Sequence, residues 1–196
     1  MMRNKMRLIV SGSRDWANTG HRYANRFFHL VYTVIGLAAL ASMVTMWCQN
    51  ERQVECLARN IYWEARTEPL DAKVKVGLIT LARVADPEWS DTICNVVFKN
   101  NQFSWTRNAE LVLRHEPKDA KNWRISLKVA RGLYEQSRLL MPPRWGCVRY
   151  YKRADNEGVS HSAREWFEKN LTRVGGFGKH AAYAPKRGCK NPLPTT

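Results

Sequence analysis

The chain has 196 residues, enough for one domain and an additional segment. Its 32 lysine and arginine residues against 17 aspartate and glutamate residues give a formal net charge of +15. This charge points to an anionic partner such as nucleic acid, lipid headgroups or the acidic polymers of a bacterial envelope. No run of lysine or arginine is longer than two residues, so a basic nucleic-acid tail is not expected and we predict no nucleic-acid partner.

The first predicted element is an apolar segment at residues 30–48. Its sequence, LVYTVIGLAALASMVTMWC, contains no charged side chain. A helix of this length, at about 1.5 Å per residue, is roughly 28 Å long, close to the hydrocarbon thickness of a bilayer. Six basic residues and one acidic residue precede the segment. The positive-inside rule therefore keeps residues 1–29 in the cytoplasm and exports residues 49–196.

These features predict a protein that crosses the inner membrane once. It would have a basic cytoplasmic tail (1–29), a transmembrane signal anchor (30–48) and an exported domain (49–196) on the periplasmic side. The sequence ALA at positions 39–41 resembles a cleavage site, so a cleaved signal peptide is the alternative. The exported residues carry 26 basic and 16 acidic side chains, a net charge of +10, and are therefore basic in their own right.

The exported domain is predicted to be mostly helical with a small β element. Asn50 can cap a helix that ends near Arg66, before Pro69, and Asp71 can cap the next helix. Amphipathic periodicity then predicts helices at 72–84, 90–99, 109–116, 120–138 and 162–170. Other segments are expected to form a loop or short strand (100–105), a strand (147–153) and a glycine-rich hairpin (174–184). The predicted fold class is therefore α+β, mostly helical.

Four cysteines lie in the exported domain. They are Cys56, Cys94, Cys147 and Cys189, and in an oxidising compartment they can pair in three ways. We predict structural disulfides, with Cys48 at the end of the apolar segment left over. The cysteine spacings match no zinc signature, so neither a metal nor a cofactor is expected.

Glu64 occupies an unusual position for a charged residue in the predicted first helix. At about 100° per residue, Leu57, Ile61 and Ala65 share one face of this helix, and Glu64 falls at the edge of that face. Burial there raises the pKa of a carboxyl group, and an acid that stays protonated near neutral pH can act as a general acid. From periodicity alone, a rim glutamate that pairs with an arginine is the simpler interpretation.

Four segments together resemble a known family. They are CLARNIYWEARTEPLDAKVKVGLITLARV, TICNVVFKNNQFSW, YYKRADN and GKHAAY. In this order they resemble spore-cortex-lytic cell-wall hydrolases of the SleB/CwlJ type, over about residues 54–183. The resemblance implies a lysozyme-like or lytic-transglycosylase-like domain that cleaves peptidoglycan between N-acetylmuramic acid and N-acetylglucosamine. It also implies that Glu64 is the catalytic acid.

The resemblance leaves the product of the reaction open. A lytic transglycosylase needs one carboxylate, which protonates the glycosidic oxygen and then accepts the proton of the muramyl C6 hydroxyl. A retaining or inverting muramidase needs a second carboxylate across the cleft. Glu68 lies one turn beyond Glu64 on the same side of the helix. We expect Glu68 to bond local backbone and to support the site rather than act as that second carboxylate.

The resemblance also implies which residues surround the substrate. The candidates are Gln102, Phe103, Ser104, Trp105, Tyr150, Tyr151 and His180. We expect one of the two aromatic residues in the 102–105 segment to line the cleft and the other to pack in the core. Only one of the two neighbouring tyrosines can face the cleft, because successive residues in a strand alternate between its faces.

Other functions fit parts of the sequence. A zinc-dependent N-acetylmuramoyl-L-alanine amidase needs about three ligands, and His115, His161 and His180 lack the tight spacing of a zinc motif. A non-catalytic basic module that binds the envelope would explain the charge but not the context of Glu64. An uncleaved anchor joined to a wall-degrading domain also resembles a phage-type endolysin held at the membrane. The expected partners are peptidoglycan glycan strands and the inner membrane.

Overall fold

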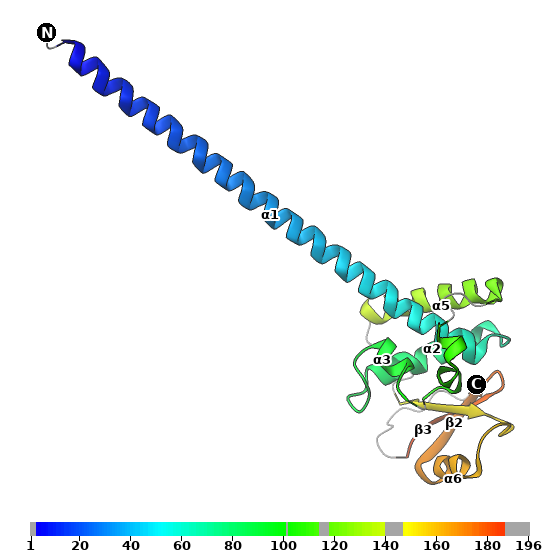
Figure 1. Cartoon of the computed structure of the whole chain (residues 1–196). Coiled ribbons are helices and arrows are strands. Elements are labelled where there is room, and N and C mark those ends of the chain that lie inside the picture. Colours follow the sequence, from blue (N-terminus) through cyan, green and yellow to red (C-terminus); the bar gives the residue numbers. More distant parts are fainter. Residues whose placement is uncertain (1–2, 101, 114–117, 140–146, 187–196) are drawn as a thin grey trace. The chain divides into compact units, whose positions relative to one another are not determined.

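The computed structural model describes residues 3–100, 102–113, 118–139 and 147–186. The chain divides into two compact units, Met1–Gln49 and Asn50–Thr196. Helix α1, Arg3–Ala65, contributes residues to both units (Figure 1). The prediction that Asn50 caps a helix was therefore wrong. No helix-breaking residue separates it from the preceding apolar segment, so the helix continues, and the Asn50 side chain instead accepts a hydrogen bond of 2.8 Å from Tyr134.

The first unit contains an apolar part of α1. Within the described residues this is the one helix long and apolar enough to cross a membrane. The candidate span begins at Phe27, and its apolar window has a mean hydropathy of 1.9 and is not buried by protein. A signal sequence has the same properties, so the anchor and its cleaved alternative both stay predictions.

The second unit has a helical core. Its helices after α1 are α2 (Leu70–Val84), α3 (Ile93–Val97), α4 (Ala109–Leu113), α5 (Ala120–Leu139) and α6 (His161–Asn170), with a 3₁₀ turn, η1 (Ser104–Arg107). Apolar side chains of α1, α2 and α3 are fully buried, among them Leu57, Ile61, Val76, Ile79 and Val97. Gly77 lets three helices approach closely, because an added Cβ would lie 2.5 Å from Leu133 of α5 and 3.0 Å from Ile61 of α1.

Helix α2 begins differently from the prediction. Pro69, not Asp71, occupies the N-cap position, and its side chain makes no capping hydrogen bond. Asp71 lies in the first turn, where it forms an ion pair of 2.8 Å with Lys75. Proline fits immediately before a helix because its fixed φ suits the turn and it needs no hydrogen-bond donor there.

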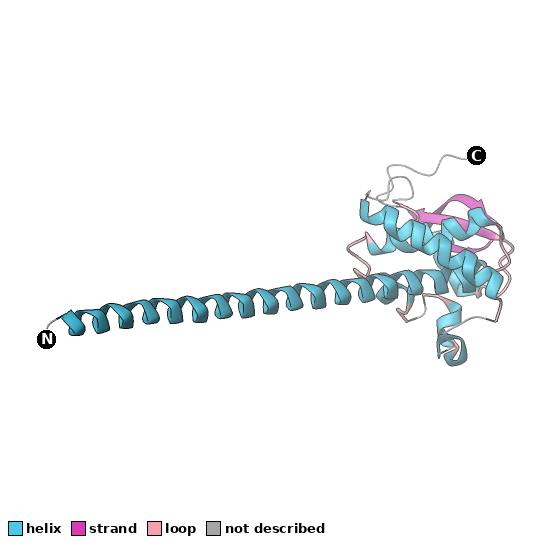
Figure 2. Cartoon of the chain, turned by 90° about the horizontal axis from the view of Figure 1, so that it is seen from above, coloured by secondary structure: helices cyan, strands magenta, loops and turns pink. Residues whose placement is uncertain are grey.

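A small antiparallel sheet completes the second unit. Its strands are β1 (Tyr150–Arg153), β2 (Leu171–Phe177) and β3 (His180–Pro185), in the order β1-β3-β2. Helix α6 contacts β2, and Figure 2 shows the sheet in magenta beside the helices. The hairpin predicted at 174–184 is present, and its strands extend to Leu171 and Pro185. The mostly helical α+β fold class is confirmed.

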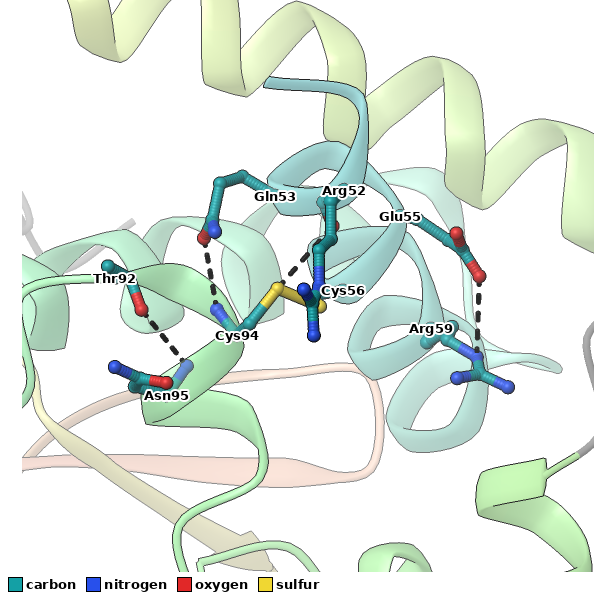
Figure 3. Close-up of a disulfide and its surroundings, with 8 residues drawn as sticks. All are labelled: Arg52, Gln53, Glu55, Cys56, Arg59, Thr92, Cys94 and Asn95. Atoms are coloured by element: carbon teal, nitrogen blue, oxygen red, sulfur yellow. Dashed lines mark hydrogen bonds and ion pairs between the residues drawn. A yellow bond between two sulfur atoms is a disulfide. The ribbon is translucent and has the colours of Figure 1, made fainter. Parts of the chain in front are cut away.

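A disulfide joins α1 to α3. Cys56 and Cys94 form it (Figure 3), and the backbone N–H of Cys94 also donates to the side-chain oxygen of Gln53 at 3.1 Å. Cys147 is disulfide-bonded as well, while Cys189 lies outside the described residues. Cys48 is an exposed free thiol, as predicted. The first disulfide therefore fastens the C-terminal part of α1 to the rest of the domain.

Candidate active site

The site is built around Glu64, in the last turn of α1. Ile61 and Ala65, which flank it on the helix surface, are fully buried, whereas Glu64 itself keeps partial exposure. The helix ends directly afterwards, at Ala65. Glu64 is therefore at the rim of the core, as the helical periodicity predicted.

A buried lysine holds the end of α1 in place. The Nζ atom of Lys73, a residue of α2 that is 3% exposed, donates to the backbone oxygens of Ala65 (2.7 Å), Arg66 (2.8 Å) and Glu68 (2.7 Å). The last carbonyl groups of a helix have no partners within the helix and carry partial negative charge. An ammonium group satisfies both needs, and this fixes the turn that carries Glu64.

The carboxyl group of Glu64 is a weak acid. Burial raises its pKa from 4.5 to about 7, while interaction with the Tyr151 hydroxyl and the positive charge of Arg83 act in the opposite direction. Desolvation is the dominant cause because it penalises the charged form. At neutral pH a large fraction of Glu64 is therefore protonated, which a general acid requires.

Strand β1 decides which tyrosine faces Glu64. Tyr151, paired with Ala182 of β3, interacts with Glu64. Its buried hydroxyl forms no hydrogen bond of standard length and angle with the described residues, so the contact with Glu64 is loose. Tyr150 lies in a different aromatic cluster, with ring centroids 6.0 Å from Trp89 and 5.4 Å from Trp166.

Arg83 is the cation of the site, although the sequence reasoning assigned it no role there. It lies at the end of α2, is 4% exposed, and its guanidinium stacks over Trp89 at 4.6 Å and Phe103 at 5.0 Å. Its Nε donates to the backbone oxygen of Arg149 at 2.7 Å. A sequence signal existed: Arg83 follows Val76 by seven residues, which places an arginine on the apolar face of an amphipathic helix.

The aromatic residues of the 102–105 segment are both in the core. Phe103 is 3% and Trp105 is 6% exposed, so both pack in the core, and the expectation that one of them also lines the cleft stays a prediction. The Trp105 indole N–H donates to the Asn60 side chain at 3.1 Å, and its ring stacks with Trp63 at 6.4 Å between centroids. Burying this segment satisfies a polar group inside the core. The neighbouring candidates differ: Gln102 is half-buried and Ser104 is exposed.

Glu68 and His180 meet at the β2–β3 turn. The carboxylate of Glu68 accepts a hydrogen bond of 3.2 Å from the backbone N–H of Lys179. This partner is distant in sequence, so the expectation that Glu68 bonds local backbone was wrong. His180 is half-buried, and its ring lies 5.3 Å from those of both Tyr151 and Phe177. Burial lowers the pKa of His180, which favours the neutral imidazole. Glu68 thus connects the end of α1 to the sheet.

Two further observations limit the alternatives. Among the described residues, no three histidine, cysteine, aspartate or glutamate side chains are grouped so that they could hold a metal. Of the histidines considered for zinc, exposed His161 lies 3.5 Å from Glu165, and His115 lies outside the described residues. A groove of about 700 Å³ runs between α2 and α5, but Glu64 does not line it. Within the described part of the chain, neither a metal-holding group nor this groove includes Glu64.

Fold and site together define a class of protein. A carboxylic acid that stays protonated near neutral pH, at the rim of a mostly helical domain, is equipped to donate a proton to a leaving group, as enzymes that cleave glycosidic bonds do. The chain belongs to the cell wall hydrolase family, whose model matches residues 67–183.

The match begins just after Glu64 and includes Arg83, Tyr151 and His180. The predicted family and the predicted class of activity, an enzyme that degrades peptidoglycan, are thereby confirmed. No curated protein sequence gives a significant match.

Two solved structures are similar to the chain. One is the catalytic domain of the germination-specific lytic transglycosylase SleB from Bacillus anthracis, with 21% identity and a TM-score of 0.48 over 69% of this chain and 94% of that one. The other is the catalytic domain of the Bacillus cereus SleB protein, with 22% identity and a TM-score of 0.48 over 69% of this chain and 90% of that one.

Proposed function

We propose that the protein cleaves the bond between N-acetylmuramic acid and N-acetylglucosamine in peptidoglycan, with Glu64 as the general acid. The observation that carries this proposal is that the carboxyl group of Glu64, at the rim of the core, has a pKa of about 7. The carboxyl group is buried enough to retain its proton, and the residue is exposed enough to reach a substrate.

The reaction begins with transfer of the Glu64 proton to the glycosidic oxygen. The bond between that oxygen and C1 of the muramyl residue breaks, its electrons go to the oxygen, and positive charge develops on the sugar ring. Glu64 becomes a carboxylate. The C6 hydroxyl oxygen of the muramyl residue then attacks C1 and closes an anhydro ring. As it does so, the Glu64 carboxylate accepts the proton of that hydroxyl, which restores the acid.

A lytic transglycosylase is favoured over a muramidase because this sequence of steps needs one carboxylate. The nearest second acid in the sequence is Glu68, in the turn after α1, and its carboxylate accepts a hydrogen bond from the backbone N–H of Lys179. A hydrolase would instead need a second carboxylate facing Glu64 across the sugar. Tyr151, whose hydroxyl interacts with Glu64, is in a position to orient the carboxyl group in either case.

The test is mass spectrometry of purified peptidoglycan digested with the full chain in detergent. Wild type should produce anhydro-muramic ends, and Glu64→Gln should lower their rate of formation at least about 100-fold, because general acid catalysis contributes that much or more. Glu55→Gln is the matched control and should keep most of the activity, because the Glu55 side chain lies on the same helix, is 46% exposed and pairs with Arg59. Reducing muramic ends that disappear in Glu64→Gln would mean a muramidase. Free alanine amino termini that persist in Glu64→Gln would mean an amidase and would refute the assignment.

For the apolar segment we propose an uncleaved anchor at residues 30–48, with the enzyme domain on the periplasmic side. Support comes from the length and composition of the span and from the basic residues that precede it. A membrane-held endolysin has this arrangement. The intact mass of the protein from a membrane fraction tests the anchor. A mass that starts near position 42, or recovery of the protein in the soluble fraction, would mean a cleaved signal instead.

A further inference from the structure

Arg83 is a buried cation in a setting that does not neutralise it. It is 4% exposed, and its Nη1 atom has no hydrogen-bond partner among the described residues. Its Nε donates to an uncharged backbone oxygen. The guanidinium carbon lies 4.6 Å from the ring centroid of Trp89 and 5.0 Å from that of Phe103. Burial of an unpaired charge is unfavourable, so a buried arginine with a free donor points to a role beyond packing.

The nearby acids leave Glu64 as the counter-charge. Asp86 forms an ion pair of 2.7 Å with Arg149, whose own positive charge disfavours the charged form of Arg83. The groups whose negative charge favours the charged form of Arg83 are Tyr151, Glu64 and Tyr150. Burial raises the pKa of both tyrosines above 10. Glu64 is therefore the one of the three that ionises near neutral pH.

We propose that Arg83 is a positioning residue for Glu64. When Glu64 gives up its proton, the buried guanidinium of Arg83 holds the carboxylate that forms. The proposal rests on the proposed function of Glu64 as the acid. In the resting site Arg83 and a partly protonated Glu64 are not joined by a direct ion pair among the described residues. The guanidinium carbon of Arg83 lies 6.0 Å from the ring centroid of Tyr151, the tyrosine that interacts with Glu64. Proton transfer to the glycosidic oxygen creates a negative charge on Glu64, and the free Nη1 donor of Arg83 becomes its partner.

This arrangement favours the step that breaks the glycosidic bond. Arg83 interacts more strongly with the ionised acid than with the neutral one, and an interaction that is stronger in the transition state than in the ground state accelerates the reaction. The same charge keeps Glu64 from becoming too weak an acid in its desolvated position. The rings of Trp89 and Phe103, which stack on the guanidinium of Arg83, hold it in place without neutralising its charge.

The first experiment measures the titration of Glu64 directly. The full chain, labelled with ¹³C at the glutamate carboxyl carbons, is titrated by NMR in detergent, and the Glu64 signal is assigned from its loss in Glu64→Gln. Arg83→Met should raise the midpoint by about one pH unit or more, the usual effect of removing a nearby opposite charge. Arg83→Lys should restore most of the wild-type midpoint.

Arg149→Met is the matched control, since it removes the positive charge of a second arginine that lies next to Arg83. Its side chain pairs with Asp86, and the group that bonds Arg83 is its backbone oxygen. It should leave the Glu64 midpoint within a few tenths of a unit. If Arg83→Met does not fold, Arg83→Gln removes the same charge and keeps a donor. An unchanged midpoint in the neutral Arg83 variant would overturn the proposal.

The second experiment measures kcat against pH for the same variants. The alkaline limb of Arg83→Met should move up together with the NMR midpoint, and kcat at the plateau should fall about tenfold or more. A purely structural role would lower kcat without moving the limb. If the NMR midpoint moves while the limb stays, Glu64 titrates with Arg83 but is not the acid. That result refutes the proposed function and leaves the coupling of the two side chains intact.

Discussion

Replacing Lys73 by methionine tests how the turn that carries Glu64 is held. Methionine keeps an apolar stem of similar length and removes the ammonium group. In the wild type that group donates to the backbone oxygens of Ala65, the last residue of α1, and of Arg66 and Glu68 in the turn that follows, at 2.7–2.8 Å. Because the residue is only 3% exposed, water has poor access to replace these hydrogen bonds.

The expected loss of stability can be worked from these contacts. A hydrogen bond that involves a charged group contributes roughly 1.5–3 kcal/mol, but three bonds from one nitrogen do not add fully, and the ammonium regains hydration on unfolding. We expect Lys73→Met to lower the free energy of unfolding by about 3–5 kcal/mol. For a domain of this size that corresponds to a fall in Tm of roughly 10 °C.

Lys75→Met is the matched control on the same helix. Lys75 pairs at 2.8 Å with Asp71, whose side chain is 60% exposed, and a surface pair of this kind contributes at most about 1 kcal/mol. Urea unfolding of both variants in detergent, followed by circular dichroism, measures the difference. Equal losses for Lys73→Met and Lys75→Met would refute the view that Lys73 holds the end of α1.

Two further predictions concern pH and the disulfide. The pKa of Glu64 is raised from 4.5 to about 7, so the folded state binds more protons than the unfolded state between these values. Its contribution to stability is fully present below pH 4.5 and is lost as pH rises through 7. Glu64→Gln should therefore gain about 3 kcal/mol relative to wild type between pH 4.5 and 8, and a constant difference in urea unfolding would contradict this. Replacing Cys56 and Cys94, which are 38 residues apart, by serine should lower the free energy of unfolding by about 4 kcal/mol in the same assay. Cys48→Ser should leave it almost unchanged. Equal losses in the two variants would contradict a stabilising role of the disulfide.

Helix ends show where local sequence reasoning succeeded and where it stopped. The end of α1 near Arg66 followed from periodicity and Pro69, which act within a few residues. The start at Asn50 did not, because a capping residue acts as a cap only when the chain before it is not helical. Asp71 likewise suits an N-cap, but Pro69 takes that position.

The sequence by itself determined that a glutamate lies on the edge of an apolar helix face, because helical periodicity is set by backbone geometry alone. It also determined that only one of Tyr150 and Tyr151 can face the site, because strand residues alternate. Only the tertiary structure decided which one, since the choice depends on the pairing of Tyr151 with Ala182. The same holds for Arg83 and Lys73, whose roles arise from contacts between segments that folding brings together.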